Sequence, residues 1–329
     1  MKMIARMMTN INNNKHDMNS KKQYLLCMLG GMMLAGMTAC SGDNDTAENS
    51  DDGVKVRRIT ITQTEEAAEA RQMATRATLT EGDGLLTASW TKGDGLTYCN
   101  LSRTQYNVQT GTNEPVFGNL TAASTAVTTQ FTGDVSCSIG DYLAVVYPAT
   151  TFVNNDKYTI SLAGQDGTLT KLATSYHYVY GKAYVKSVTD KTANATIGKM
   201  KSLLTVCKFS FVNKDDGAAI PIKSLTISYG GTGEDAGTYP QSATVKIIDE
   251  TNGILEQENV HATGVTGSEA LTISASGQTE VYVALLRTTN SRTYNFTVTN
   301  SSGTYTGTAK ATLTEGEYVE ATGLRLTKQ

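Results

Sequence analysis

Apolar and polar positions divide the 329-residue chain into three stretches with different patterns. Residues 24–39 form a glycine-rich apolar run, and residues 41–53 are acidic and hold no apolar side chain larger than alanine. From residue 54 onward, short segments alternate apolar and polar side chains and are separated by Gly, Asp and Asn. Alternation with a period of two places one face of a strand against a core. The third stretch is therefore predicted to consist of strands and turns.

The predicted strands recur at nearly regular spacing through this third stretch. Examples are DYLAVVYP at 141–148, IKSLTISY at 222–229 and RTYNFTVTN at 292–300. The chain has 30 glycines, which favour turns, and 16 tyrosines, which favour strands. The sequence shows no long amphipathic helical pattern. These features predict an all-β protein of two β-sandwich domains, residues 54–190 and 191–329, divided near a polar segment.

The apolar run is predicted to be a signal peptide, residues 1–39, because it is too short and too rich in glycine for a membrane span. Two lysines precede it, and Met18 is a reasonable true start. MTAC at 37–40 resembles the lipobox of bacterial lipoproteins, in which a signal peptidase cuts before the cysteine and the thiol is lipidated. Cys40 would then carry lipid and hold the protein to the outer membrane. The alternative is a plain signal peptide with an incidental cysteine.

Residues 40–53 are predicted to be the lipidated cysteine and a flexible acidic tether. SGDND, which follows Cys40, resembles the export signal of Bacteroidetes surface lipoproteins; an ordinary acidic linker is the alternative. Thr46 lies in Asp-Thr-Ala, which resembles a Bacteroides O-glycosylation motif.

Three cysteines, Cys99, Cys137 and Cys207, remain in the predicted domains. They are widely spaced and odd in number, so they do not form a dense disulfide framework. Each is expected to be a small apolar filler on a strand. Whether two of them form a disulfide is left open.

Candidate chemistry is sparse. The formal net charge of −3 does not favour nucleic-acid binding. His177 and His261 are the histidines of the third stretch, and both are expected to be structural. No spacing of His and Cys indicates a metal site, and neither a nucleophile elbow nor a phosphate-binding loop occurs. We therefore expect no cofactor, no metal and no enzymatic activity.

Arginines stand out near the start of the third stretch. Val54, Val56, Ile59 and Ile61 alternate along a predicted first strand, residues 54–62, with a change of parity at Arg57–Arg58 that indicates a bulge or a weakly held strand. Arg71 and Arg76 follow in a charged, alanine-rich connection. Exposed arginines in such a segment suit a trypsin-like protease. Solubilising charge is the alternative.

Several passages together resemble the fimbrillin family of Bacteroidales. They are the lipobox at Cys40, the passage TRATLTEGDGLLTASWTKGDG at 75–95, the strand YLAVVYPA at 142–149, and the closing segment GEYVEATGLRLTK at 316–328. In the second passage, Thr75-Arg76-Ala77, Trp90 and Gly93-Asp94 are the matching residues. The order and spacing of the motifs carry the resemblance.

The resemblance implies two transthyretin-like β-sandwich domains and a subunit of a type V pilus, exported as a lipoprotein precursor to the cell surface. An arginine-specific protease would remove the leader strand, residues 54–62, by cutting after Arg76, Arg71 or, less favourably, Arg58. The groove left behind would accept a donor strand from another subunit. The candidate donor is residues 318–326, with Val319 and Ala321 on one parity and Leu324 and Leu326 on the other.

Two functions follow as hypotheses. The first is a structural and adhesive pilus subunit that polymerises with other subunits and contacts a host or bacterial ligand. The broken alternation of the donor makes it imperfect, so the chain could be a tip or anchor subunit. The second is a surface lipoprotein that never polymerises and binds glycan or a host ligand. Trp90, the single tryptophan, fits a core position better than a sugar platform.

Overall fold

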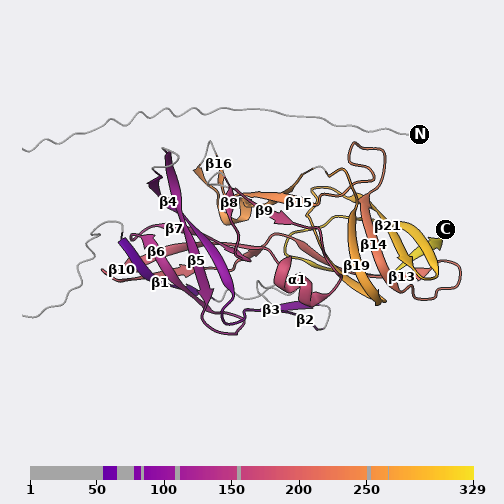
Figure 1. Ribbon diagram of the computed structural model, residues 1–329, viewed down its shortest axis with the longest axis horizontal. Coiled ribbons are helices and arrows are strands. Elements are labelled where there is room, and N and C mark those ends of the chain that lie inside the picture. Colours follow the sequence, from indigo (N-terminus) through magenta and orange to yellow (C-terminus); the bar gives the residue numbers. More distant parts are fainter. Residues whose placement is uncertain are drawn as a thin grey trace, which may run out of the picture. The chain divides into compact units, whose positions relative to one another are not determined.

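Strands make up nearly all of the computed structural model, which describes residues 55–64, 78–82, 85–107, 112–153, 157–249, 253–265 and 267–329 (Figure 1). The all-β prediction is confirmed. Everything described belongs to one compact unit. The signal peptide, Cys40, Thr46 and the tether lie outside the described residues.

Eight strands of the first half form one sheet in the order β11-β1-β6-β5-β4-β7-β10-β12. Their bounds are β1 (Lys55–Gln63), β4 (Gly95–Asn107), β5 (Thr112–Ala122), β6 (Gln130–Cys137), β7 (Tyr142–Tyr147), β10 (Val179–Val188), β11 (Thr192–Ile197) and β12 (Lys201–Ser202).

This first sheet closes on itself. β11 pairs with β1 on one side and with β10 on the other, so seven strands, all but β12, form a continuous hydrogen-bonded ring. Alternating side chains fill its interior, as the burial pattern of β6 shows. The interior core includes Ile59, Ile61, Trp90, Leu120 and Phe131, all at most 1% exposed. Closure removes the two free edges that an open sheet would present.

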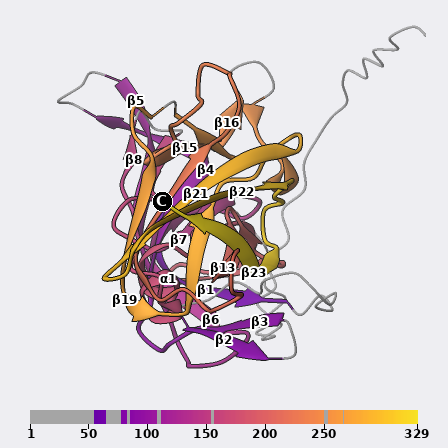
Figure 2. The same ribbon diagram turned by 90° about the vertical axis from the view of Figure 1, so that its right-hand side faces the viewer.

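The second half forms a seven-stranded open sheet in the order β19-β14-β21-β22-β23-β13-β20 (Figure 2). Its strands are β13 (Thr205–Asn213), β14 (Ile222–Tyr229), β19 (Leu271–Gln278), β20 (Glu280–Leu285), β21 (Arg292–Asn300), β22 (Gly303–Ala311) and β23 (Tyr318–Lys328). β23, the last strand, is parallel to β13 and antiparallel to β22.

A four-stranded sheet joins strands of both halves, in the order β18-β15-β9-β8. The strands are β8 (Phe152–Val153), β9 (Lys157–Ser161), β15 (Ser242–Lys246) and β18 (Ala262–Gly264). Two small hairpins complete the strand list: β2 (Thr78–Gly82) with β3 (Leu85–Ser89), and β16 (Ile248–Asp249) with β17 (Gly253–Ile254). The pairing of β9 with β15 means that the two halves share a sheet.

The predicted domain boundary between residues 190 and 191 stays a prediction. Strand pairing assigns β11 and β12 to the first sheet, and the second sheet begins at Thr205. A second core extends from Cys99 and Tyr180, on the ring's outer face, through Tyr158 to Phe296 in the second sheet.

The sequence pattern did not predict the helix α1 (Leu169–Ser175). Thr168 caps it, because its hydroxyl accepts a hydrogen bond from the Lys171 N–H at 3.1 Å. Leu172 and Ala173 bury its inner face. A single 3₁₀ turn, η1 (Gln257–Asn259), is the other helical element among the described residues. At seven residues α1 is too short for a clear helical periodicity, so pattern analysis missed it.

All three remaining cysteines are buried and free. Burial raises the pKa of Cys137 to about 11 and the pKa values of Cys99 and Cys207 to about 12. Each thiol is therefore a neutral apolar filler, and the disulfide that the sequence left open is not present among them.

Candidate functional site

The candidate site is β1 together with the two strands that flank it. Eight residues of β1 pair antiparallel with β6, from Lys55 to Thr62, and six pair parallel with β11, from Arg58 to Gln63. The predicted leader strand thus corresponds to β1, except that Val54 lies outside the described residues. A strand with partners on both sides has its backbone N–H and C=O groups satisfied.

The side chains of β1 alternate without a break. Arg57, Ile59, Ile61 and Gln63 point inward and are at most 8% exposed, whereas Val56 is 70% exposed. The expected bulge at Arg57–Arg58 is wrong, because the pairing with β6 runs through both residues without a shift. Arginine takes an inward position here because backbone oxygens surround it. Its Nε donates to the Thr189 carbonyl at 2.7 Å, and Nη1 donates to the Cys137 carbonyl.

The other end of β1 contacts Trp90. The indole Nε1 donates to Oε1 of Gln63 at 3.2 Å, which satisfies a fully buried N–H group. The indole also packs edge-on against Phe131 and Tyr147, at centroid distances of 4.9 and 5.3 Å. Trp90 is therefore part of the wall that the leader strand covers, which agrees with a core role.

Of the three candidate cleavage residues, the structure describes Arg58 but not Arg71 or Arg76. Arg58 lies in the middle of β1, and its N–H donates to the Lys191 carbonyl at 2.9 Å. Its side chain is exposed and lies 3.4 Å from Asp134. A protease could reach its peptide bond only after β1 leaves the ring. Arg71 and Arg76 lie outside the described residues, between Thr64 and β2.

The candidate donor, β23, has a bulge at its centre. Phe209 pairs with Ala321 but Phe211 pairs with Leu324, so β23 has two residues between these pairs where β13 has one, which is one extra residue. Gly323 lies within this step with a φ of +67°, a conformation that favours glycine. The bulge explains the broken alternation of Val319 and Ala321 against Leu324 and Leu326.

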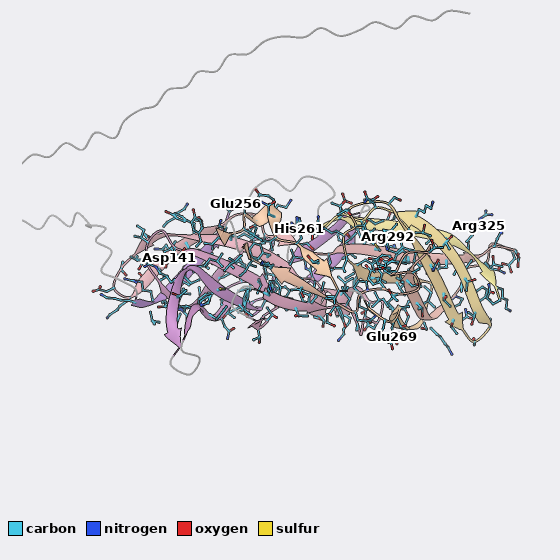
Figure 3. The ribbon with its side chains drawn as sticks, turned by 90° about the horizontal axis from the view of Figure 1, so that it is seen from above. Asp141, Glu256, His261, Glu269, Arg292 and Arg325 are labelled. Carbon is cyan, nitrogen blue, oxygen red and sulfur yellow. The ribbon has the colours of Figure 1, made fainter. Side chains whose placement is uncertain are left out.

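β23 is held unevenly in its own sheet. Seven of its residues pair with β13, but only Thr327 and Lys328 pair with β22. Leu326 is the single residue of β23 that is fully buried, at 1% exposure. Arg325 is exposed near the end of the second sheet (Figure 3). β23 therefore has one fully buried apolar side chain and several half-buried ones, whereas both isoleucines of β1 are fully buried.

A carboxylate from the β2–β3 hairpin contacts the first residue of β23. Glu81 accepts hydrogen bonds from the hydroxyl of Tyr318 at 2.6 Å and from the hydroxyl of Tyr282. Lys208 Nζ lies 2.9 Å from the same carboxylate. We call these four residues the Glu81 cluster. It connects the first hairpin after Arg76 with β13, β20 and β23.

The Glu81 cluster changes the acidity of its members. Burial alone would raise the pKa of Glu81, but the hydrogen bonds from Tyr282, Tyr318 and Lys208 outweigh it and lower the pKa from 4.5 to about 2. Burial, followed by the bond to Glu81, raises the pKa of Tyr282 to about 12. Glu81 is therefore ionised at all ordinary pH values. Sequence analysis missed this cluster, because Glu81 lies in TEGDG and its partners are 127 to 237 residues away.

Other functional possibilities find little support in the described part of the chain. Residues 55–64, 78–82, 85–107, 112–153, 157–249, 253–265 and 267–329 contain no group of three His, Cys, Asp or Glu residues that could hold a metal ion. No helix within those ranges is long and apolar enough to cross a membrane. His177 is 1% exposed, and His261 lies 2.8 Å from Glu315.

Comparisons with known proteins give structural likeness only. Neither the protein-family profiles nor the curated proteins contain a match. A candidate cell adhesion protein from Bacteroides uniformis is 16% identical with a TM-score of 0.47, over 80% of this chain and 98% of that one. A candidate cell adhesion protein from Bacteroides ovatus is 13% identical with a TM-score of 0.47, over 84% and 96%. A shaft pilin from Lactobacillus rhamnosus GG is 11% identical with a TM-score of 0.34, over 84% and 98%. At these scores the likeness carries no argument, and the proposals below rest on this chain's own contacts.

Replacing Ile61 by alanine should lower the free energy of unfolding by about 2–5 kcal/mol, because it leaves a cavity inside the closed ring. Urea unfolding followed by fluorescence of Trp90, which packs in the same core, measures the change. Thr62→Ala, at the exposed neighbouring position, should change stability by less than about 0.5 kcal/mol. Equal effects of the two substitutions would mean that β1 is not seated in the ring.

Glu81→Gln should lower the free energy of unfolding by about 1 kcal/mol at neutral pH, since the partly solvent-accessible charged hydrogen bonds are lost. A depressed carboxylate pKa contributes stability above the unfolded value and loses it as pH falls toward the folded value. The difference between wild type and Glu81→Gln should therefore be constant at pH 6–8, shrink below pH 4.5 and vanish near pH 2. Glu269→Gln, at an exposed carboxylate without a side-chain partner among the described residues (Figure 3), is the control that should show neither effect. A pH-independent difference at Glu81 would contradict the assignment.

Proposed function

We propose that this chain is a structural and adhesive subunit of a cell-surface fibre that assembles by exchange of its leader strand. The single observation that carries the proposal is the position of β1. It completes a ring of seven strands, yet it is joined to the rest of the domain by the segment that holds Arg71 and Arg76. Cleavage in that segment would leave β1 bound by non-covalent contacts alone.

Loss of β1 would expose two strand edges at once. β6 and β11 would each present unpaired backbone N–H and C=O groups, on either side of a trough previously filled by Ile59 and Ile61. An edge of this kind binds another extended strand, and here both edges would bind the same one. The groove is therefore suited to a donor strand from a second subunit.

The end of β23 carries the side-chain pattern that the groove requires. Inward positions of β1 read polar, apolar, apolar, polar from Arg57 to Gln63. Residues 322–328 read Thr, Leu, Leu, Lys at the same spacing, with Leu324 matching Ile59 and Leu326 matching Ile61. We therefore place residues 322–328 of one subunit in the groove of the next. The donor predicted from sequence, residues 318–326, is thereby shifted to residues 322–328, which begin at the bulge.

Burial of apolar side chains favours transfer of β23 from its own sheet into the groove of another subunit. β23 buries one residue completely in its own subunit, whereas the groove buries two apolar side chains of its occupant completely. Leu324 is half-buried in its own sheet and would be fully buried in the groove, so the transfer would gain part of the about 1.5–3 kcal/mol that full burial of a large aliphatic side chain contributes. The Glu81 cluster opposes transfer, because it binds Tyr318 at the start of β23. We infer that β23 stays in its own sheet until the hairpin that carries Glu81 is displaced.

The proposal includes the export route expected from the sequence. Cys40 would be lipidated and anchor the precursor to the outer membrane, and an arginine-specific protease would release the subunit into the fibre. Thr46 in the tether would be a candidate for O-glycosylation. The ligand contacted by the fibre would belong to a host or to another bacterium.

The alternative is a surface lipoprotein that keeps its leader strand and its lipid, and binds a ligand as a monomer. One observation favours it: β23 already pairs with β13 through seven residues and has no need of a second subunit. In that case β1 is a permanent part of the ring.

The N-terminus of the protein recovered from intact cells distinguishes the two functions, and mass spectrometry measures it. Strand exchange predicts a start at Ala77, after Arg76, or at Gln72, after Arg71. Arg76→Ala should abolish a start at Ala77, while Lys92→Ala, in the turn after Trp90, should leave it unchanged. A start at lipidated Cys40 in all of the recovered protein would contradict strand exchange and support the monomeric lipoprotein.

Peptides test the donor assignment without disturbing the buried Leu326 in its own subunit. A peptide of residues 318–329 should occupy the groove of cleaved subunits and block formation of heat-stable polymers, measured by electrophoresis without boiling. The peptide with Leu326→Asp should lose this effect, because a carboxylate would be buried in the apolar trough. The peptide with Thr327→Ser, on the outward face, should retain it. Inhibition that is independent of Leu326 would contradict the proposed pairing.

A further inference from the structure

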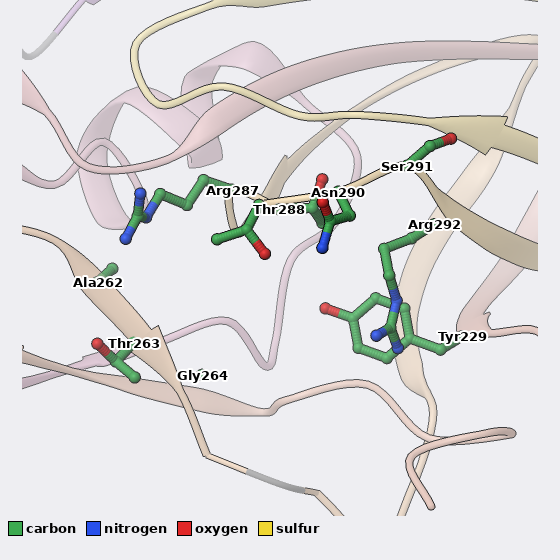
Figure 4. Close-up of a pocket in the computed structure, with 10 residues that line it drawn as sticks. Tyr229, Ala262, Thr263, Gly264, Arg287, Thr288, Asn290, Ser291 and Arg292 are labelled. Atoms are coloured by element: carbon green, nitrogen blue, oxygen red, sulfur yellow. The ribbon is translucent and has the colours of Figure 1, made fainter. Parts of the chain in front are cut away.

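A polar cavity of about 630 Å³ lies in the second half, away from β1 and its groove. It is lined by Tyr229 at the end of β14, by the three residues of β18, and by the loop of residues 287–292 that leads into β21 (Figure 4). The size is within the range of small-molecule binding sites, which is roughly 300–1,000 Å³. The ring, β1 and the exchange of β23 have no part in its walls.

Two arginines stand at the two ends of the loop. Figure 4 shows Arg287 at one end of the cavity and Arg292 beside the ring of Tyr229 at the other. The Nε atom of Arg287 lies 3.5 Å from the Glu315 carboxylate, and the arginine side chain is 36% exposed. A partly exposed guanidinium has N–H donors that can bind a further carboxylate through two parallel hydrogen bonds.

Arg292 is fixed in a different way. Its guanidinium lies over the ring of Tyr229, 4.1 Å from the ring centroid, and one Nη pairs with Asp235. Stacking on an aromatic ring and an ion pair hold the group in place at the far end of the cavity. The arginine covers the ring, so Tyr229 supports the cation and does not serve as a stacking surface for a ligand.

The charges around the cavity leave an excess of positive charge. Glu315, 5% exposed, is contacted by Arg287, by Lys201 at 3.0 Å and by His261 at 2.8 Å. With Arg292 and Asp235 included, three permanently charged cations, Arg287, Lys201 and Arg292, lie beside two carboxylates, Glu315 and Asp235. The lining itself holds two arginines and no carboxylate, in a chain whose net charge is −3.

The opposite wall supplies uncharged hydrogen-bonding groups. Among the described strands, β18 pairs with β15 alone and lies at the edge of its sheet, so alternate backbone groups on its other side are outside that ladder. Ala262 N–H points to this side, because it donates to Glu315 at 3.4 Å. Gly264 N–H therefore points the same way. The side chains of Thr263, Asn290 and Ser291 add hydroxyl and amide groups at the rim.

We propose that this cavity binds an acidic oligosaccharide through a sugar carboxylate held by Arg287. The ring hydroxyls would bond to the Gly264 N–H and the Asn290 amide, and Arg292 would attract a second acidic unit. A small inorganic anion would occupy only a fraction of 630 Å³. An extended apolar peptide finds no exposed apolar side chain in this lining, since Ala262 is buried. The inference is independent of strand exchange and holds equally for a fibre subunit or a monomeric lipoprotein.

Calorimetric titration of the full chain with trigalacturonate and with 3′-sialyllactose tests the site. Trigalacturonate with methyl-esterified carboxyl groups is the matched neutral probe. We expect at least one acidic probe to bind, and its neutral counterpart, the ester or lactose, to bind at least about tenfold more weakly. Affinity should fall as salt is raised. Equal binding of an acidic probe and its neutral counterpart, or no binding of either acidic probe up to about 10 mM, would overturn the proposal.

Variants locate the binding. Arg287→Gln should weaken binding of the acidic probe by at least about tenfold, because one pair of hydrogen bonds between the guanidinium and the sugar carboxylate is lost. Thr263→Trp, on the exposed face of β18, should block the cavity without removing a charge. Lys223→Gln, an exposed lysine on β14, removes one charge elsewhere and should leave affinity unchanged. Unaltered binding in both Arg287→Gln and Thr263→Trp, with both variants folded by circular dichroism, would place the ligand elsewhere and refute the site.

Discussion

The first half of this protein depends on closure of a hydrogen-bonded ring by β1. Each strand of the ring has a hydrogen-bonded neighbour on both sides, although β5 and β6 pair through two residues only. β1 is the strand whose removal would open it, and it is also the first element of the described chain. The ring is therefore closed by the segment nearest to the membrane tether expected from the sequence. In the proposed precursor, β1 would block association through this groove for as long as it stays in place.

β1 and β23, the first and last strands of the described chain, share an order of polar and apolar positions but differ in how many apolar side chains they bury completely. β1 buries Ile59 and Ile61 completely and has Arg57 and Gln63 at the two mouths of the ring, where carbonyl groups and Trp90 satisfy them. β23 offers the same order of polar and apolar positions beyond its bulge, but buries only Leu326 completely. In the proposed exchange, Leu324 would move from a half-buried position in its own sheet to a fully buried one in the ring of another subunit.

The Glu81 cluster and the polar cavity add two separate constraints to this architecture. The cluster connects the hairpin that follows the candidate cleavage segment to the first residue of β23. A hydrogen bond therefore joins residues from the two ends of the described chain. The cavity is built from the edge of β18 and from the loop before β21, and β1 contributes no residue to its lining. Assembly and ligand binding can therefore occupy different parts of one subunit without sharing residues.

The sequence by itself determined the all-β class, the candidate leader strand at 54–62 and most of the inner strands, because alternation with a period of two directly reports which face of a strand is buried. It also located Trp90 in a core and the break in the donor pattern between Ala321 and Leu324. Only the tertiary structure decided that Arg57 rather than Val56 points inward, since carbonyl oxygens from two distant segments satisfy the guanidinium. The short helix α1, closure of the ring through β11, the Glu81 cluster and the cavity between Arg287 and Arg292 were likewise decided there. The helix is too short to show a helical period, and the other three depend on contacts between residues far apart in the chain, about which local periodicity carries no information.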